Sequence, residues 1–414
     1  MFRNVLKILT CVVVLGVAPS AWADRLSLYI DADFSISRRA AEAIDLGVHT
    51  ALAEVGYQVS GIQLDVVRKD HRANSKRTLA NLRAFRKDPQ AIAIVGGSLS
   101  PPYLTNKQYI NENGILLLLP WSAAGPITRA DAGDENWIFR LSVDDTKAGP
   151  FLVSRAVNNA QCRRTALLLI DTGWGRANSS TMQEAFSDAG QDAAPVFMFS
   201  AGLGTASARS VAASMATTRP DCVIMLASAD TGALLVNALH EVLPDVKIIS
   251  HWGILAGEFE KQVSPAVRMG MHMEVLQTCG LEVQQRGGAV LARALDGASQ
   301  RGTQFDSLSD VPSSTGFVHG YDLTKLFLAA LEQAVNTVEW GDAPIAARRD
   351  MVRLALENLP GPIEGILKSY ERPFRAYSMT NPDAHEALGM PDLCMVAFSQ
   401  ASGLVLADSV QRDR

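Results

Sequence analysis

The tripeptide Asp-Thr-Gly occurs twice, at Asp171–Gly173 and at Asp230–Gly232, each time after an apolar run. Paired copies are typical of aspartic proteases, in which two carboxylates share one proton and act as acid and base. Such proteases carry their copies on two all-β lobes, whereas both copies here lie in strand–helix patterns. In α/β proteins a polar residue regularly follows a strand and caps the next helix. We therefore favour capping, and an aspartic-type hydrolase remains the less favoured alternative.

Other catalytic signals are weaker. The sequence completes no glycine-rich nucleotide-binding motif and contains no Gly-x-Ser-x-Gly nucleophile motif. Its seven histidines are scattered, without the spacing of a metal site. A net charge of −5 without a long basic run disfavours nucleic acid and anionic membranes as partners. We expect no enzyme activity, no cofactor and no metal.

A second group of polar and aromatic residues follows the predicted strands. In open α/β sheets, ligands bind beyond the carboxyl ends of strands, where loops and helix N-termini meet. Ser100 before Pro101 has the pattern of a helix N-cap, and the free N–H groups of such a terminus suit a carboxylate. Three of the six tryptophans also follow strands, where an indole more often lines a cleft than fills a core. The candidate ligand-binding residues are Ser98, Ser100, Tyr103, Trp121, Ser122, Ala123, Trp174, Asp230 and Trp252.

The elements that would position these residues form two successive series. In each series, apolar runs of strand length are separated by helical patterns of about 10–15 residues, which is typical of βαβ units with a parallel sheet. The predicted strands of the first series are 26–30, 62–67, 91–95 and 115–119. Those of the second are 165–170, 195–199, 223–226, 246–249 and 270–275. Two helices, 321–338 and 345–359, and two strands, 393–398 and 403–408, follow.

The first 23 residues have the pattern of a secretory signal peptide. Arg3 and Lys7 precede an apolar stretch, 8–18, and Ala21-Trp22-Ala23 fits a cleavage site. The apolar stretch is well short of the roughly 20 residues that span a bilayer. We expect cleavage after Ala23 and a mature protein in the periplasm.

Four cysteines remain after cleavage: Cys162, Cys222, Cys279 and Cys394. An even number in an oxidising compartment favours disulfides, and four cysteines allow three pairings. If the first strand of the second series lies beside its third, Cys162 and Cys222 fall at the starts of neighbouring strands. Our hypothesis is that these two are bridged and that Cys279 pairs with Cys394.

Several of these segments resemble the type I periplasmic solute-binding proteins, specifically the leucine/isoleucine/valine-binding family of ABC transporters. The segments are 94–100, 114–123, 137–145 and 169–175, and the resemblance covers nearly the whole mature chain. It implies an α/β fold of two doubly wound, Rossmann-like lobes joined by three crossings, near 141–143, 274–276 and 360. Lobe 1 would comprise 24–141 and 277–360, and lobe 2 would comprise 142–276 and 361–414.

The resemblance also assigns roles to site residues. Ser100 matches the serine that holds the ligand carboxylate, Trp121 and Ala123 match contacts on the next loop, and Trp174 matches an aromatic contact. Amino-acid binders of the family commonly place an acidic residue near position 252 to hold the ligand ammonium. The sequence His251-Trp252-Gly253 supplies none, although Asp230 could substitute.

The resemblance implies a monomeric, periplasmic substrate-binding subunit whose partner is an ABC permease in the inner membrane. We expect a small organic ligand with a carboxylate or other polar head and an apolar or aromatic body, held between Trp121, Trp174 and Trp252. A cation in an aromatic cage and a branched-chain amino acid remain alternative ligands. A ligand sensor that feeds a membrane kinase remains an alternative function.

Overall fold

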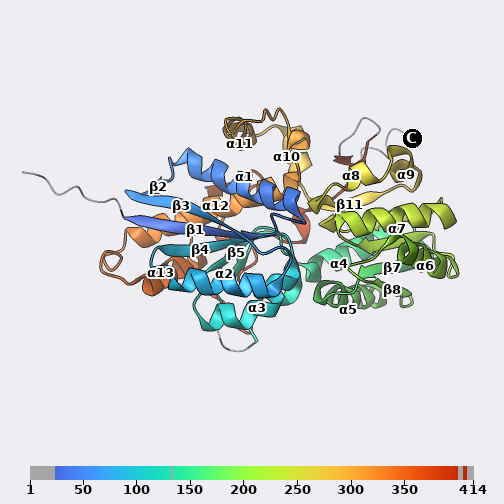
Figure 1. Ribbon diagram of the computed structural model, residues 1–414, viewed down its shortest axis with the longest axis horizontal. Coiled ribbons are helices and arrows are strands. Elements are labelled where there is room, and N and C mark those ends of the chain that lie inside the picture. The colour runs from blue at the N-terminus through green and yellow to red at the C-terminus, as the bar shows by residue number, and fades with distance from the viewer. Residues whose placement is uncertain (1–23, 132, 134, 400–403, 408–414) are drawn as a thin grey trace, which may run out of the picture.

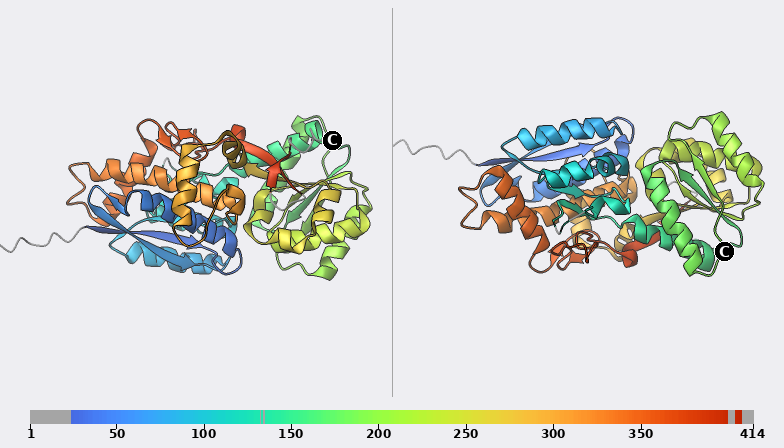
Figure 2. Two further views of the ribbon diagram at one scale, coloured as in Figure 1. Left: turned by 90° about the horizontal axis from the view of Figure 1, so that it is seen from above. Right: turned by 90° about the horizontal axis from the view of Figure 1, so that it is seen from below.

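Two lobes lie side by side along the long axis of the molecule (Figure 1) in the computed structural model, which describes residues 24–131, 133, 135–399 and 404–407. Each lobe has a central sheet with helices on both faces, as the two views of Figure 2 also show. The expected two-lobe α/β architecture is therefore confirmed. The predicted signal peptide lies outside the described residues. Within the described part, no helix is long and apolar enough to cross a membrane.

The sheet of the first lobe has the strand order β2-β3-β1-β4-β5-β6. Its strands are β1 (Arg25–Ala32), β2 (Gln58–Val59), β3 (Ile62–Asp70), β4 (Ala91–Gly96), β5 (Leu117–Leu119) and β6 (Ile138–Arg140). Only β2 runs antiparallel to its neighbour among these strands. The four predicted strands are confirmed, because continuous apolar runs suit a parallel sheet that is covered on both faces. The short strands β2 and β6 were not predicted.

The helices of the first lobe come from distant parts of the chain. They are α1 (Arg38–Glu54), α2 (Ser75–Lys87), α3 (Ser100–Glu112), η1 (Gly125–Thr128), α10 (Gly280–Arg286), α11 (Ala289–Ser299), η4 (Leu308–Asp310), α12 (Ser314–Val335) and α13 (Ile345–Glu357). Helix α12 is buried along most of its length and packs against α1. A Cβ atom at Gly320 would lie 2.5 Å from Ile44 O, so glycine is what permits this close approach.

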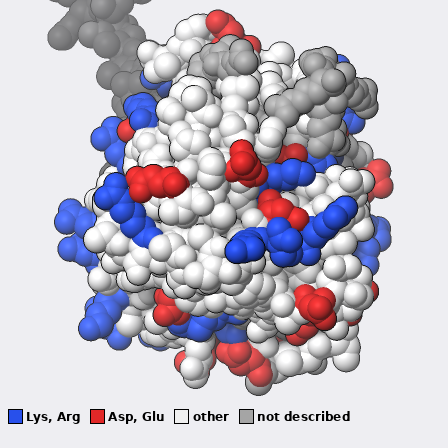
Figure 3. Space-filling model, turned by 90° about the vertical axis from the view of Figure 1, so that its right-hand side faces the viewer, with Lys and Arg blue, Asp and Glu red and all other residues white. Residues whose placement is uncertain are grey.

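The sheet of the second lobe has the order β15-β14-β11-β10-β9-β7-β8. Its strands are β7 (Thr165–Ile170), β8 (Val196–Phe199), β9 (Cys222–Leu226), β10 (Lys247–Ser250), β11 (Glu274–Thr278), β14 (Leu393–Phe398) and β15 (Leu404–Leu406). Its helices are α4 (Asp145–Ser154), η2 (Arg155–Asn159), α5 (Gly173–Asp188), α6 (Thr205–Ala216), α7 (Ala229–Val242), η3 (Trp252–Ala256), α8 (Phe259–Gln262) and α9 (Pro265–Gly270). Figure 3 shows acidic and basic side chains interspersed over the end of this lobe.

The disulfide hypothesis is confirmed. Strand β7 pairs with β9, so the first strand of the second series does lie beside its third. Cys162 is bonded to Cys222, and Cys279 is bonded to Cys394. The first bond joins the amino ends of two strands within the second lobe, whereas the second joins the end of β11 to β14.

Among the described residues the chain passes between the two sheets after β6, after β11 and before β14. The third passage is not near residue 360, as the sequence suggested. Beyond α13 the chain forms the hairpin β12 (Ile363–Glu364) and β13 (Ser369–Tyr370), whose Tyr370 hydroxyl donates to Asp322 of α12 over 2.7 Å. The turn η5 (Met390–Asp392) then leads into β14.

The segment 363–388 therefore packs against the first lobe, although the resemblance assigned it to the second. Further along this segment, Glu386 pairs with Arg140 of β6. The pattern Pro360-Gly361-Pro362 ends a helix, but it carries no information about which lobe the chain enters next.

Candidate functional site

The loops that follow β4 and β5 lie against each other at the carboxyl edge of the first sheet. The N–H of Ala124 donates to Ser100 Oγ over 3.2 Å, and Ser122 Oγ donates to the carbonyl oxygens of Gly97 and Leu99 over 2.8 and 3.0 Å. Ser100 and Ser122 are buried, and so is Ala123. The structure thus brings together two groups of residues that the sequence placed at separate strand exits.

Ser100 is the first residue of α3 and not its N-cap, which is Leu99. The interpretation of Ser100 as the N-cap of this helix was therefore wrong. Pro101 and Pro102 follow, and because proline has no N–H, this helix terminus offers few backbone donors to an anion. The hydroxyl of Ser100 instead faces the loop after β5.

In the backbone of residues 121–124, the carbonyl oxygens all have hydrogen-bond partners, whereas some of the N–H groups do not. Each of its four carbonyl oxygens accepts a hydrogen bond: Trp121 O from Ser142, Ser122 O and Ala124 O from Arg140, and Ala123 O from the N–H of Asp145. The N–H groups of Ser122 and Ala123 donate to no acceptor within the part of the chain that the structure describes. Buried N–H groups without an acceptor are rare and costly. This loop is therefore suited to bind an acceptor atom that is not part of the chain.

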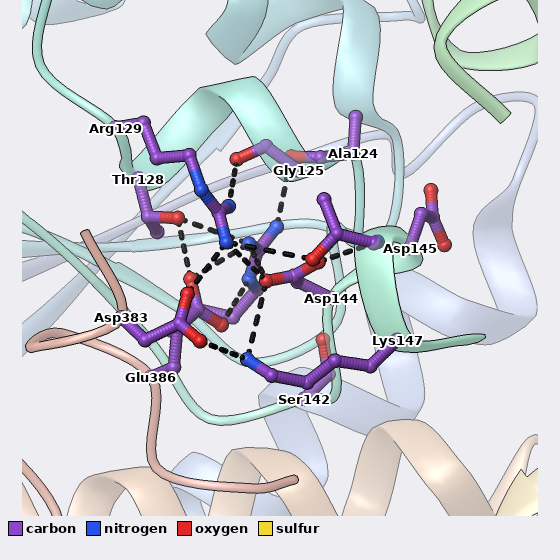
Figure 4. A network of polar contacts seen from close by, with 12 residues as sticks. Ala124, Gly125, Thr128, Arg129, Ser142, Asp144, Asp145, Lys147, Asp383 and Glu386 are labelled. Carbon is purple, nitrogen blue, oxygen red and sulfur yellow. Dashed lines mark hydrogen bonds and ion pairs between the residues drawn. The ribbon is translucent and has the colours of Figure 1, made fainter. Parts of the chain in front are cut away.

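A buried charged network holds that loop (Figure 4). The Arg140 guanidinium donates to both carboxylate oxygens of Glu386 over 2.7 and 2.8 Å and to the Thr128 hydroxyl over 2.9 Å. Burial raises the pKa of Glu386, although Arg140 opposes the shift. Burial also acts to raise the pKa of Asp144, but the charges of Arg140 and Arg129 outweigh it and hold this pKa well below its usual range. The network fixes the first crossing beside the candidate loop.

The facing wall on the second lobe is built on Asp145. Its carboxylate accepts from Trp174 Nε1 over 2.6 Å, from Asn178 Nδ2 over 2.8 Å and from His251 Nε2 over 2.9 Å. Trp174 is the second residue of α5, whose N-cap is Thr172, and His251 follows β10. The rings of Trp174 and Trp252 both meet His251 edge to face, with centroids 5.2 and 4.8 Å away.

The side chains of Trp121, Trp174 and Trp252, which we expected to line an open site, are largely buried in this structure. Trp121 is 2% exposed and lies against Gly316 of α12, and Trp252 is 3% exposed. Trp174 is half-buried. The roles of these three tryptophans in ligand binding remain predictions.

The other predicted residues are placed as follows. Tyr103 is fully buried beneath the β4 loop, where its hydroxyl accepts from the N–H of Gly97 over 2.6 Å. Ser98 is half-buried in that loop. Asp230 is exposed on α7 and accepts from Gln262 over 2.7 Å. Asp171 is exposed and pairs with Arg176, so the two Asp-Thr-Gly carboxylates have separate partners.

Sequence reasoning missed Arg140, Asp145 and Glu386 as supports of the site. The only local signal for Asp145 is its place beside Asp144 at the start of α4, where acidic residues are common for dipole reasons alone. Sequence analysis considered His251 only as a residue near the position where amino-acid binders of the family place an acidic residue.

The two lobes touch in this structure. Ser313 Oγ in the first lobe donates to Leu255 O in the second over 2.5 Å, and Arg39 of α1 pairs with Glu260 of α8. Hollows of about 330 and 230 Å³ lie elsewhere, one beside α1 and one at the amino end of β7. Neither is lined by a predicted site residue.

Comparisons with known proteins agree on the fold. Residues 33–253 match a family model described as periplasmic binding protein. A periplasmic binding protein type 1 from Bordetella pertussis is 14% identical, with a TM-score of 0.75 over 92% of this chain and 99% of that one. A leucine-binding protein from Thermotoga maritima is 15% identical, with a TM-score of 0.72 over 93% and 99%. A solute-binding protein from Rhodopseudomonas palustris in complex with benzoate is 14% identical, with a TM-score of 0.70 over 92% and 96%. No curated protein matches the sequence.

Proposed function

The chain belongs to the periplasmic binding protein family, and on this premise we propose that it is the solute-binding subunit of an ABC importer. The bound solute would contact both lobes and so stabilise the closed arrangement. An inner-membrane permease would recognise that arrangement and accept the solute. The two-lobe fold and the contacts between the lobes support this proposal.

We propose that the solute carries a carboxylate. The observation that carries this proposal is the pair of buried, unpartnered N–H groups of Ser122 and Ala123 beside the Ser100 hydroxyl. A carboxylate has two acceptor oxygens, and hydrogen bonds to a charged acceptor are about twice as strong as neutral ones. Leucine and benzoate, the solutes of two of the similar proteins, both carry this group.

The wall on the second lobe favours an organic acid without an ammonium group. The Asp145 carboxylate already accepts three hydrogen bonds, Asp230 is exposed and bonded to Gln262, and Asp171 pairs with Arg176. Each of these carboxylates is already engaged by donors of the protein, and a ligand ammonium would have to compete with those donors. We therefore expect a carboxylate head with an apolar or aromatic body.

A titration with matched ligands tests this proposal. The full-length chain is exported, purified from the periplasm and titrated with leucine, benzoate and 4-methylpentanoate, which is leucine without its ammonium group. Tryptophan fluorescence and calorimetry report binding. We expect at least one of the two acids to bind more tightly than leucine. Saturation by leucine with no response to either acid would show that the ligand class is wrong.

The importer role has its own test. Deletion of the gene should abolish uptake of the labelled ligand by intact cells, and the wild-type gene should restore it. Uptake that persists while the purified protein binds the ligand tightly would favour a sensor over a transporter.

A further inference from the structure

Asp145 is bonded to the candidate loop of the first lobe and to residues of the second lobe. Its backbone N–H donates over 2.8 Å to the carbonyl oxygen of Ala123, in the loop that follows β5 of the first lobe. Its carboxylate accepts hydrogen bonds from residues that follow two different strands of the second lobe, Trp174 after β7 and His251 after β10. A single residue at the first crossing therefore joins both halves of the site.

The surroundings of the carboxylate leave it little freedom. Its side chain is only 3% exposed, and its three donors come from two elements of the second lobe: Trp174 and Asn178 from α5, and His251 from the end of β10. Figure 4 shows the side chain turned away from the charged network that surrounds its neighbour Asp144. The two consecutive aspartates thus have separate tasks, one in the crossing and one in the cleft wall.

The hydrogen bonds fix the orientation of the two aromatic rings. An ionised carboxylate only accepts, so His251 Nε2 and Trp174 Nε1 must both present their protons to Asp145. If either ring turned away, the buried charge would lose a donor, and an incompletely paired buried charge is strongly unfavourable. Asp145 therefore sets the orientation of the Trp174 and His251 rings.

We propose that Asp145 is the positioning residue of the binding cleft: it orients Trp174 and His251 and holds them in register with the Ala123 loop. This inference rests on the proposed function. Asp145 acts through these residues and does not contact the ligand, because its side chain is 3% exposed and Trp174, Asn178 and His251 already occupy three of its roughly four acceptor positions.

The variant Asp145→Asn tests the proposal. Asparagine has nearly the same size, but its NH₂ group cannot accept a hydrogen bond, so either Trp174 and Asn178 or the Nε2 donor of His251 loses its present acceptor. We expect the affinity for acids and for leucine to fall by a similar factor, about tenfold or more. Asp171→Asn is the matched control, since Asp171 follows β7 three residues before Trp174, is exposed and pairs with Arg176.

A second variant gives an independent measure and does not require Asp145→Asn to fold. Trp174→Phe keeps an aromatic ring but removes the Nε1 donor, and it should also weaken binding. Because both substitutions break the same hydrogen bond, the double variant should lose less than the product of the two single losses. Subtracting the fluorescence spectrum of Trp174→Phe from that of the parent protein gives the emission of Trp174. The wavelength of this emission should shift when Asp145 is replaced by asparagine, and the measurement needs no ligand.

The outcomes separate the inference from the proposed function. If the wild type binds no acid, the proposed ligand class fails, while the ligand-free spectra still report whether Asp145 orients Trp174. Three results would overturn the inference: unchanged affinity in Asp145→Asn or Trp174→Phe, independent effects of the two substitutions, or an unshifted Trp174 spectrum. Selective loss of leucine binding would also overturn it, because it would make Asp145 a direct contact of the ammonium group.

Discussion

Arg39 Nη1 lies 2.5 Å from Glu260 Oε1 and so joins the start of α1 in the first lobe to α8 in the second. The same guanidinium donates to the carbonyl oxygen of Gly257 over 3.3 Å. These contacts connect the lobes directly, without a ligand between them. On the proposed function these contacts break when the lobes separate, so the protein itself contributes part of the stability of the closed arrangement.

Replacing Glu260 by glutamine should weaken ligand binding modestly. The pair is partly exposed, and exposed pairs contribute about 0.2–1 kcal/mol, which corresponds to a loss of up to about fivefold in affinity. Salt screens such pairs, so the difference from the wild type should shrink at high ionic strength. Calorimetry at low and high salt measures both effects. Glu241→Gln, which removes the exposed pair with Arg209 within the second lobe, is the control, and an unchanged affinity in Glu260→Gln at low salt would contradict the prediction.

Ser100→Ala should weaken the binding of acids without unfolding the protein. The hydroxyl is placed beside the Ala123 loop, and a hydrogen bond to a charged group contributes about 1.5–3 kcal/mol, or roughly tenfold to a hundredfold in affinity. Fluorescence titration with the best acid measures the change. The exposed Ser180→Ala is the control. Equal affinities in both variants would remove Ser100 from the site.

The strands could be predicted because burial leaves a local record in the sequence. Strand β7, at Thr165–Ile170, is apolar after its first residue since helices cover both faces of its sheet, and its predicted limits match those observed. The pairing of Cys162 with Cys222 followed from the strand order alone. Each of these features depends on residues that are close together in sequence or on a common topology.

The exposure of the site residues could not be predicted in the same way. Trp121 follows a strand, as a residue that lines a cleft would, but Gly316 of α12 lies against it almost two hundred positions later. Likewise, the partners of Arg140 include Glu386, which the sequence placed on the other lobe. Local patterns show where a strand ends, whereas the segment that covers its end comes from distant parts of the chain.

The dependence of stability on pH should differ between the wild type and Asp31→Asn. Burial raises the pKa of Asp31 to about 7 and that of Asp322 to about 6, and burial lowers the pKa of His71 and His319 to about 4. Between about pH 4 and 6.5 the unfolded histidines bind protons that the folded ones do not, so they make stability rise with pH. The folded aspartates keep protons that the unfolded ones release, so they make stability fall with pH over the same window.

These contributions oppose one another, so the free energy of unfolding of the wild type should change little over this window. Asp31→Asn removes one of the two aspartates that make the free energy of unfolding fall with pH. The free energy of unfolding of this variant should therefore rise with pH, by up to about 1.4 kcal/mol per pH unit relative to the wild type. Urea unfolding at about pH 4.5, 5.5 and 6.5 measures the slope. Asp65→Asn, on the exposed pair with Arg25, is the control. Parallel slopes in Asp31→Asn and the wild type would contradict the prediction.

The two disulfides should differ in their effect on binding. Both close long loops, with separations of 60 and 115 residues, so removing either should lower the free energy of unfolding by about 2–4 kcal/mol. The Cys162–Cys222 bond lies at the amino ends of β7 and β9, away from the cleft, whereas Cys279–Cys394 joins the strands that flank the second and third crossings. Replacing Cys279 and Cys394 by serine should therefore also weaken ligand binding several-fold, because β11 and β14, beside the second and third crossings, lose their covalent link. Urea unfolding and calorimetry on both double variants measure the two quantities, and equal affinities would mean that the hydrogen bonds between β11 and β14 suffice to hold these strands together.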